Sequence, residues 1–482
     1  MQRIDTVLES RTVHDRLVFG LIIAAVFLDV VDFSIVQVAL PSIRTQLLVS
    51  LTDSQWIIGA YGITMAGFLL LSGRIGDIYG QKKLFITGIV VFTVASLTGG
   101  FATSLLSLVV SRAVQGIGAA ISTVTAFSIF IQVFPEGPKR NRALGIFIAV
   151  LSAGFAAGSV SGGVLTDTLG WRSVLFVNVP IGVVAAVLSQ RFLPESGGRL
   201  ANRHLDVPGA LTVTSGLILF VYALTNISNI GFLTTPTLVS LGLSLIVLAA
   251  FVAIEARSEA PLMPLSFLRR GSVLNANVLS LILGSNVSGL AFIITIYLQQ
   301  ILGYSAEAAG TGFLPGAIIF FVVGGWGASR LMNRFGIRRV LLASASLIAV
   351  GSGLLAQISA KGDYLGILPG FILWSLGASI GFPALNVAAI AGTKPGEEGL
   401  ASGLITTSTR VGFPLGLAVL LTIATVMDPA PVEIADTTAT AAGVVTGFRY
   451  ALLTAALLGA LGVLIAARIR DAPRNYAPPP VA

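Results

Sequence analysis

Long apolar runs separated by short polar segments dominate the pattern of this 482-residue chain. Each run is roughly 17 to 25 residues long and nearly free of charge, which is the length that an α-helix needs to cross a membrane. Helices satisfy their own backbone polar groups in lipid, so the sequence predicts an all-α membrane protein with about fourteen transmembrane helices. The predicted helices lie near 17–40, 54–73, 83–101, 105–130, 142–166, 173–193, 208–228, 237–256, 273–298, 308–329, 339–358, 364–391, 399–426 and 445–467.

The segments between the runs are short and rich in Pro, Gly and charge, as turns between antiparallel helices are. The first run, Leu17 to Leu40, is too long for the core of a cleavable signal peptide and contains two aspartates, so we interpret it as the first span. Most of the 29 Lys and Arg residues fall at the termini or in alternate turns. Because basic residues accumulate on the cytoplasmic side, we expect a multi-pass protein with both termini in the cytoplasm.

The composition narrows the possible functions. Hydrophobic residues make up 55% of the chain and charged residues 10%, and the mean hydropathy is +0.92. The net charge of +8 follows from the cytoplasmic turns and their contact with anionic membrane lipid, so we expect no nucleic-acid partner. The chain has no cysteine, which excludes disulfides, thiol catalysis and cysteine metal sites. Its two histidines, His14 and His204, lie outside the predicted spans, which disfavours a histidine proton relay.

A weak internal repeat links two distant turns. The turn from Gly73 to Lys83 recurs from Ser329 to Arg339, after the second and the tenth predicted helix. Two six-helix bundles related by an axis along the membrane normal would place these turns at equivalent positions, with the seventh and eighth helices as inserted linker helices. The predicted divisions are a cytoplasmic N-terminus (1–16), a first six-helix bundle (17–193), two linker helices with flanking loops (194–271), a second six-helix bundle (272–468) and a cytoplasmic tail (469–482).

Four motifs agree in order and spacing with one family of transporters. They run from Asp32 to Pro41, from Gly73 to Lys83, from Arg112 to Gly118 and from Trp171 to Pro180. Over essentially its whole length the chain resembles the fourteen-span drug:proton antiporter family of the major facilitator superfamily. The resemblance implies a multidrug or antibiotic exporter: proton-coupled efflux of a drug, an antibiotic or a secondary metabolite by alternating access across the bacterial cytoplasmic (inner) membrane. The proton gradient would drive it without a cofactor, and we expect a monomer whose partners are a small organic substrate, protons and membrane lipid.

The fifth predicted helix departs from the family at one position. The family's antiporters usually carry a Gly-Pro pair there, whereas Gly158 is followed by Ser159 in this chain. The glycine frame remains at Gly154, Gly158, Gly162 and Gly163, and its four-residue spacing lets a neighbouring helix pack closely or slide. The missing proline leaves a proton-coupled uptake symporter of a small metabolite open as an alternative.

Asp29 and Asp32 are the only acids predicted well inside a span. An ionised carboxylate in hydrocarbon costs on the order of several kcal/mol unless it is paired, protonated or exposed to water, so such acids are functional candidates. Their three-residue spacing puts them on adjacent faces of one helix, where they can share a cavity and compete for a proton. We predict that they couple transport to protons; the alternative is that one merely bonds a neighbouring helix.

Arg112, in the fourth predicted helix, is the cation expected to accompany these acids. An unpaired guanidinium inside a span is very costly, so Arg112 needs a partner or water. By the resemblance it faces the cavity and tunes the protonation of a carboxylate in the first helix; the alternative is a structural ion pair between the two helices. Arg410 and Arg449 also fall in predicted spans, and their roles stay open.

The turn motif offers Gly73 and Gly80 for close backbone approach, Asp77 as an acidic partner, and a basic end at Lys82 and Lys83. We interpret it as a cytoplasmic gate clasp that favours the outward-facing state when its ion pairs form. The alternative is a turn that only sets topology. Asp77 favours the clasp, because an acid adds nothing to the positive-inside pattern.

Aromatic and amide residues in otherwise apolar helices are the candidates for substrate binding. Each one singly is also explained by packing or by anchoring at the membrane interface. The seventh predicted helix and the middle of the tenth carry no acid, which favours neutral, weakly cationic or anionic substrates over dicationic ones. The candidate cavity residues are Phe33, Gln37, Gln115, Tyr297, Gln299, Trp374 and Asn386.

Other function classes fit the sequence less well. An intramembrane enzyme would need a second acidic cluster, a catalytic histidine or a Gly-x-Ser-x-Gly serine in a span, and none is found, so we predict a secondary active transporter and not an enzyme. ATP-driven transport would need a phosphate-binding Gly-Lys-Ser/Thr loop, which the chain lacks. The transporter motifs disfavour a passive channel.

Overall fold

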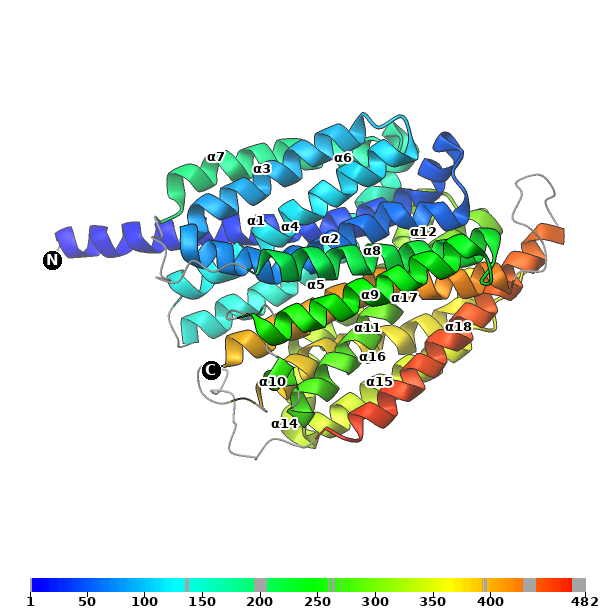
Figure 1. Ribbon diagram of the computed structural model, residues 1–482. Helices are drawn as coiled ribbons and strands as arrows, with labels where there is room; N and C mark the ends of the chain where they lie inside the picture. The colour runs from blue at the N-terminus through cyan, green and yellow to red at the C-terminus, as the bar shows by residue number, and fades with distance from the viewer. Residues whose placement is uncertain are drawn as a thin grey trace.

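The computed structural model confirms the all-α architecture (Figure 1). It describes residues 2–134, 138–194, 206–258, 261, 265–268, 270–391, 393, 397–427 and 439–469. Within these ranges every regular element is a helix, and thirteen helices are long and apolar enough to cross a membrane. Helix α5 is not among the thirteen, but it is 32 residues long and packs along α1, where the sequence predicts the fifth span.

The helices before the linker form what we call the first helix group. Two of them begin at serine caps: the Ser50 hydroxyl accepts a hydrogen bond from Asp53 N–H, and the Ser104 hydroxyl accepts one from Ser107 N–H. The group consists of α1 (Gln2–Leu47), α2 (Leu51–Tyr79), α3 (Gln81–Gly100), α4 (Leu105–Val133), α5 (Pro138–Leu169), α6 (Ser173–Phe176) and α7 (Asn178–Phe192).

The remaining helices form the linker and the second helix group. The linker helices are α8 (Val207–Ile230) and α9 (Thr235–Arg257), followed by the short α10 (Leu265–Leu268). The second group consists of α11 (Gly271–Ile296), η1 (Tyr297–Ile301), α12 (Ala306–Thr311), α13 (Leu314–Ile319), η2 (Phe320–Gly327), α14 (Ala328–Phe335), α15 (Ile337–Leu355), α16 (Tyr364–Ile390), α17 (Glu398–Val426) and α18 (Ala439–Ala466).

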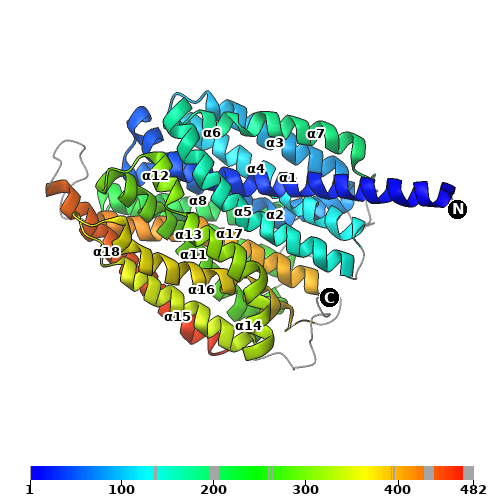
Figure 2. The same ribbon diagram turned by 180° about the vertical axis from the view of Figure 1, so that it is seen from behind.

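Helix α1 is longer than the sequence analysis expected. It begins at Gln2 rather than near residue 17 and projects beyond the other helices (Figures 1 and 2). The segment 2–16 contains neither Gly nor Pro, so nothing in its backbone chemistry ends the helix before the membrane-spanning part. Of the predicted C-terminal tail (469–482), only Ile469 lies within the described residues.

Two predicted helices are interrupted in the structure. The sixth is divided at Val177 into α6 and α7. The tenth becomes α12, α13, the π-helix η2 and α14, with a turn at Gly312 and Phe313 and with Pro315 near the start of α13. Proline lacks an N–H group and suits the first turn of a helix, which is where Pro315 stands in α13. Short π-helical stretches inside α-helices are frequent at functional sites.

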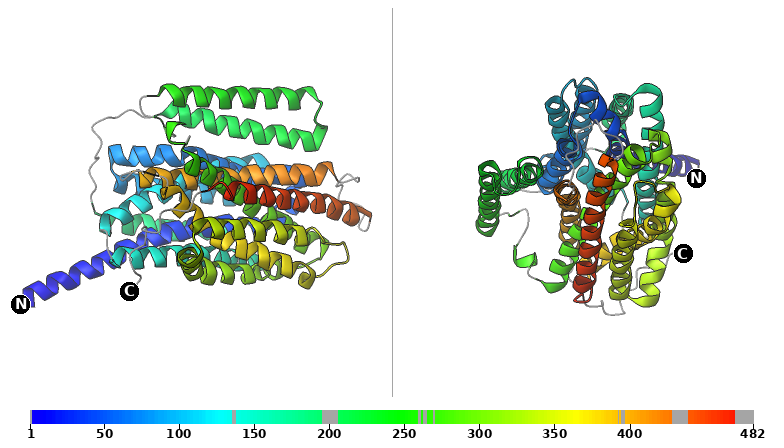
Figure 3. Two further views of the ribbon diagram at one scale, coloured as in Figure 1. Left: turned by 90° about the horizontal axis from the view of Figure 1, so that it is seen from below. Right: turned by 90° about the vertical axis from the view of Figure 1, so that its right-hand side faces the viewer.

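The linker helices α8 and α9 lie at the edge of the bundle (Figure 3). Helix α8 covers the line where α2 and α17 meet: Gln55 Nε2 donates to Thr225 Oγ1 over 2.9 Å, and Thr422 Oγ1 donates to the Leu224 carbonyl over 3.1 Å. Helix α9 packs mainly on α8 and leaves residues such as Ile246 exposed, as a lipid-facing helix does. The division into two bundles at residues 193 and 272 stays a prediction.

The two groups contact each other along three lines. Helix α2 packs against α17, α5 against α12 and α13, and α1 against α11. Because consecutive spans run antiparallel, the start of α1 lies at the same end of the bundle as the turns α2–α3 and α14–α15, and the end of α1 lies with α12 at the opposite end (Figure 1).

Candidate functional site

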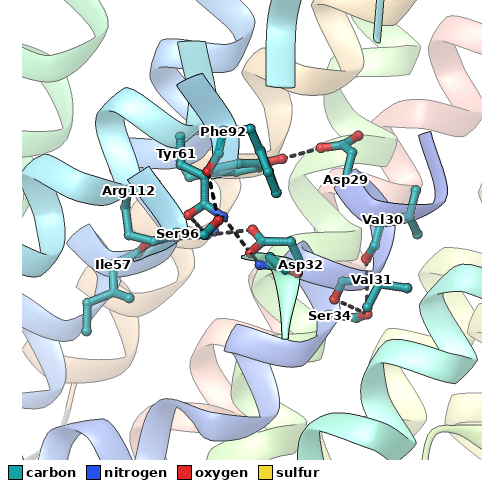
Figure 4. A network of polar contacts seen from close by, with 12 residues as sticks. Asp29, Val30, Val31, Asp32, Ser34, Ile57, Tyr61, Phe92, Ser96 and Arg112 are labelled. Carbon is teal, nitrogen blue, oxygen red and sulfur yellow. Dashed lines mark hydrogen bonds and ion pairs between the residues drawn. The ribbon is translucent and has the colours of Figure 1, made fainter. Parts of the chain in front are cut away.

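Asp32 of α1 is the centre of a closed polar network inside the first helix group (Figure 4). Arg112 Nη1 of α4 lies 2.5 Å from Asp32 Oδ2. The side-chain amides of Gln115 (α4) and Asn178 (α7) each donate to Asp32 Oδ1 over 2.7 Å. The side chains of Asp32 and Arg112 are 0% and 1% exposed. A buried ion pair persists only when further hydrogen bonds satisfy both ions, and this network supplies them.

Arg112 has further partners that hold it in place. Its Nε donates to the Ile57 carbonyl over 3.1 Å, and its Nη1 also lies 2.6 Å from Gln115 Oε1. The guanidinium carbon lies 4.3 Å from the centre of the Tyr61 ring, which is a cation–π contact. Arg112 therefore sits inside the first group and does not line the central cavity described below, although the resemblance placed it there.

Asp29, one turn earlier on α1, has a different arginine. Arg410 Nη2 from α17 lies 2.9 Å from Asp29 Oδ2, and the Tyr61 hydroxyl donates to Asp29 Oδ1. Helix α17 belongs to the second group, so this ion pair joins the two groups. Tyr61 contacts both pairs, with its ring against Arg112 and its hydroxyl on Asp29.

The two carboxylates do not share one cavity, which corrects the sequence expectation. A three-residue step along an α-helix separates two side chains by roughly 60°. That angle is enough to direct Asp32 toward α4 and α7, and Asp29 toward α2 and α17. Each acid consequently has its own positively charged partner.

The groups are joined a second time at the end of the bundle where α1 ends. Arg44 Nη1 donates to Gln300 Oε1 over 2.8 Å, and Gln299 Nε2 donates to the Val38 carbonyl over 2.9 Å. We call these contacts, together with those between α5 and α12, the outer seam. The outer seam closes the space between the groups on this side.

Helix α5 completes the outer seam through Asp167 and Gly163. The Asp167 carboxylate accepts hydrogen bonds from the N–H groups of Ala306 (3.3 Å) and Glu307 (2.8 Å) at the start of α12. A Cβ atom on Gly163 would lie 2.5 Å from the Ala306 carbonyl oxygen. Only glycine lets α5 and α12 approach this closely.

The other three glycines of the predicted frame face α1. A Cβ atom on Gly162 would lie 2.9 Å from Ile35 Cα, and those on Gly154 and Gly158 would meet α1 side chains and backbone as well. Ser159, which stands where the family has proline, is buried and donates to a backbone carbonyl one turn earlier over 2.9 Å. The predicted glycines are thus the positions at which α5 packs closely against α1 of its own group and against α12 of the second group.

A cavity of about 320 Å³ lies between the groups, on the side of the outer seam nearer the start of α1. Two of the predicted substrate residues, Phe33 and Trp374, line it. The Phe33 ring stacks on Phe413 with centroids 5.5 Å apart. Arg410 is the one charged residue in the described lining, so the arginine of the Asp29–Arg410 pair lies in the cavity wall.

The remaining predicted cavity residues have partners within the protein or lie elsewhere. Gln115 belongs to the Asp32 network and Gln299 to the outer seam. The Tyr297 hydroxyl donates to a backbone carbonyl after α15, and the Asn386 amide donates to one in α16. Gln37 is buried away from the cavity, and its amide has no hydrogen-bond partner among the described residues. Polar groups in apolar helices are often satisfied by backbone rather than by a ligand, which the sequence pattern does not reveal.

The turn motif and its repeat have the same backbone geometry. Gly80 has φ 101° and Gly336 has φ 85°, and each donates its N–H to the carbonyl four residues earlier. This left-handed conformation requires glycine in both copies. Gln81 Nε2 donates to Asp77 Oδ1 over 2.8 Å, and a Cβ atom on Gly73 would lie 3.0 Å from an α4 side chain. The gate-clasp role of the motif stays a prediction.

Sequence reasoning assigned no role to Arg410 or Asn178. Arg410 was noted as an arginine inside a span, and that was the available signal, but its partner is 381 positions away along the chain. Asn178 lies within the motif from Trp171 to Pro180 that opens the sixth predicted helix. The sequence alone does not show which acid Arg410 or Asn178 contacts, because only the fold brings each of them next to α1.

The helix order, the repeated turns and the Asp32 network can be set beside known proteins. The family described as Major Facilitator Superfamily matches residues 22–417 of the chain. This chain belongs to the Major Facilitator Superfamily.

Its relatives within the superfamily include export and resistance proteins. The cephamycin export protein CmcT of Amycolatopsis lactamdurans is 40% identical over 400 residues, which cover 82% of each chain. The puromycin resistance protein pur8 of Streptomyces alboniger is 34% identical over 92% of this chain and 88% of its own. The tetracenomycin C resistance and export protein of Streptomyces glaucescens is 31% identical over 82% of this chain and 73% of its own. The resemblance to drug antiporters is confirmed, and the chain is a multi-pass efflux transporter and not an enzyme.

Two solved structures share the fold. The human organic anion transporter MFSD10 has a TM-score of 0.61 and 16% identity, covering 94% of this chain and 99% of its own. A mutant of the nucleoside transporter NupG has a TM-score of 0.65 and 11% identity, covering 94% of this chain and 100% of its own. At these identities the likeness concerns the fold alone, and it confirms the predicted major facilitator fold.

Proposed function

We propose that this protein is a proton-coupled exporter of an antibiotic or a related small organic molecule across the bacterial cytoplasmic membrane. It works as a monomer by alternating access, with both termini in the cytoplasm, and the proton gradient drives it without a cofactor. The substrate class is supported by relatives named for cephamycin, puromycin and tetracenomycin C.

The arrangement of the helix groups fits an inward-facing step of such a cycle. With the start of α1 in the cytoplasm, the outer seam lies on the far side of the membrane. Phe33 lines the cavity and precedes Val38 and Arg44 of the outer seam along α1, so the cavity lies on the cytoplasmic side of the closure. Substrate would enter from the cytoplasm, and opening of the outer seam would release it outside.

The observation that carries the proposal is the sealed network around Asp32. A carboxylate that is 0% exposed and bonded to Arg112, Gln115 and Asn178 is stable as an anion only while these partners stay in place. A proton on Asp32 removes the charge that Arg112 neutralises, and Arg112 must then move or find another anion. Proton binding at Asp32 therefore changes the balance between two arrangements of the helices.

Tyr61 can pass this change to the contact between the groups. Its ring lies against Arg112 and its hydroxyl holds Asp29, which is paired with Arg410 of the second group. In the proposed cycle a proton from outside neutralises Asp32 in the outward-facing state. The proton leaves to the cytoplasm when Asp32 pairs again with Arg112, as in the inward-facing arrangement described here. Proton entry thereby resets the carrier for the next export step.

The proposal is tested by accumulation of cephamycin, puromycin and lipophilic dyes in efflux-deficient cells that express the wild type, Asp32→Asn or Glu307→Gln. Glu307 is exposed and its side chain is outside the network, so Glu307→Gln is a matched loss of one carboxylate. We expect the wild type and Glu307→Gln to lower accumulation of at least one compound, and a protonophore or Asp32→Asn to abolish the effect. Raised accumulation in wild-type cells would indicate uptake and contradict export.

A further inference from the structure

The wall of the central cavity combines an aromatic surface with a single positive charge. Phe33, Phe413, Phe313 and Phe371 line it, and Arg410 is the only charged side chain in its described lining. No acid lines this part of the cavity, so the described wall offers nothing to neutralise a cationic substrate. A volume of about 320 Å³ lies within the range of small-molecule sites in proteins.

Two hydrogen-bond donors in the same wall have no partner within the described part of the protein. Trp374 Nε1 and Ser375 Oγ are both buried without a hydrogen bond, and both residues line the cavity. Trp374 is 5% exposed and Ser375 is 0% exposed. Leaving a buried donor unsatisfied is costly, so such donors in a cavity wall are sites for a ligand that carries acceptors.

Arg410 is only partly used by its internal partner. Its guanidinium has five N–H donors, and within the described residues one hydrogen bond is formed, from Nη2 to Asp29. Its side chain is 17% exposed, in contrast to the sealed Arg112. Asp29 also accepts a hydrogen bond from the Tyr61 hydroxyl, so Asp29 keeps a partner if Arg410 turns away.

We propose that the cavity selects organic acids. The substrate's carboxylate or other oxyanion binds Arg410 in place of Asp29, its apolar or aromatic body lies among the phenylalanines, and a further acceptor group bonds to Trp374 and Ser375. Asp29 acts as an internal anion that occupies Arg410 when the cavity is empty. This inference rests on the proposed function, because it assigns the substrate class of the same transport cavity.

The test is equilibrium binding of dansylglycine and its methyl ester to the purified full-length protein in lipid nanodiscs, followed by dansyl fluorescence. The two probes differ at one group, which is a charged carboxylate in the acid and a neutral methyl ester in the other. We expect the acid to bind about tenfold more tightly than the ester to the wild type, since a charge-assisted pair with arginine is lost in the ester. Arg410→Gln should remove the preference, and Arg410→Lys should keep much of it.

Two further variants sharpen the test. Asp29→Asn removes the competing carboxylate and should tighten binding of the acid several-fold, with little change for the ester. Trp374→Phe keeps the aromatic wall but removes one donor, and should weaken both probes to a similar extent. Retained ester binding by Arg410→Gln would show that this variant is folded.

Equal affinity of the wild type for the acid and the ester would overturn the inference, and so would an acid preference that survives in Arg410→Gln. This outcome is separable from failure of the proposed function, because binding in nanodiscs needs no proton gradient. Proton-dependent export of a neutral dye without acid preference would reject the organic-acid site alone. Acid preference without any proton-dependent export would reject the transport cycle alone.

Discussion

Asp29 and Asp32 are one turn apart on α1, yet they belong to different parts of the molecule. Asp32 pairs with Arg112 inside the first helix group, where both side chains are sealed from solvent. Asp29 pairs with Arg410 from the second group, beside the cavity and with the arginine partly exposed. An aspartate and an arginine therefore form two different kinds of ion pair. The Asp32–Arg112 pair is internal to one helix group, whereas the Asp29–Arg410 pair exists only while the two groups are in contact.

The largest expected effect comes from breaking the sealed pair. Arg112→Gln leaves Asp32 buried without a counter-charge, which should lower the free energy of unfolding by about 3–5 kcal/mol. Arg410→Gln should cost clearly less, because Asp29 keeps the Tyr61 hydroxyl and Arg410 is 17% exposed. Denaturant unfolding of the purified protein measures both.

The double variant Asp32→Asn/Arg112→Gln serves as the control for this comparison. Removing both charges should restore part of the stability that Arg112→Gln alone loses, since no uncompensated ion remains. Equal losses for Arg112→Gln and Arg410→Gln would show that the two pairs do not differ as described.

A medium effect is expected from blocking the outer seam. In Gly163→Val, the added atoms would meet the Ala306 backbone of α12. Overpacking of this kind costs about 1–3 kcal/mol and should shift the equilibrium away from the closed seam roughly tenfold. Because the chain has no cysteine, a single Val38→Cys, at a position 1% exposed in the closed seam, reports opening through labelling by a membrane-impermeant maleimide.

Gly20→Val is the matched control for that experiment. A Cβ atom on Gly20 meets nothing within 4 Å, so this substitution should leave the labelling rate at Val38→Cys unchanged. If Val38→Cys is labelled no faster together with Gly163→Val than together with Gly20→Val, the contact between α5 and α12 does not hold the outer seam closed.

The smallest effect should come from Tyr61→Phe, which removes the contact between the two ion pairs and leaves both pairs in place. The ring stays against Arg112, and only the hydrogen bond to the Asp29 carboxylate is lost, at a cost of about 1.5 kcal/mol. The exposed Tyr79→Phe is the control and should change stability by less than Tyr61→Phe does. Unfolding of both variants, each alone and combined with Arg410→Gln, measures whether Tyr61 and Arg410 act together through Asp29. Simple additivity would mean that Tyr61 does not connect them.

The sequence predicts the helices well because apolar length is a strong local signal in membranes. It misses the early start of α1 and the broken segment from α12 to α14, since these depend on weak local preferences and on packing against neighbours. The glycine positions of α5 were recognised from their spacing, but their separate contacts with α1 and with α12 follow only from the fold.

The functional residues show the same limit. The rarity of membrane carboxylates identifies Asp29 and Asp32, and Arg112 lies in a recognisable motif. Arg410 and Asn178 are distant in sequence from the acids that they contact, so no spacing rule pairs them. The amide and aromatic candidates are the least predictable, because Gln299 and Tyr297 bond to backbone groups that only the three-dimensional structure brings near.

The central claim is that Asp32 couples a proton to the movement of substrate. The most direct test compares two assays of purified protein in liposomes: exchange of labelled for unlabelled substrate without a pH gradient, and substrate movement driven by an imposed pH gradient. The account predicts that Asp32→Asn keeps exchange and loses gradient-driven transport, whereas Glu307→Gln keeps both. Gradient-driven transport at the wild-type rate in Asp32→Asn would contradict it.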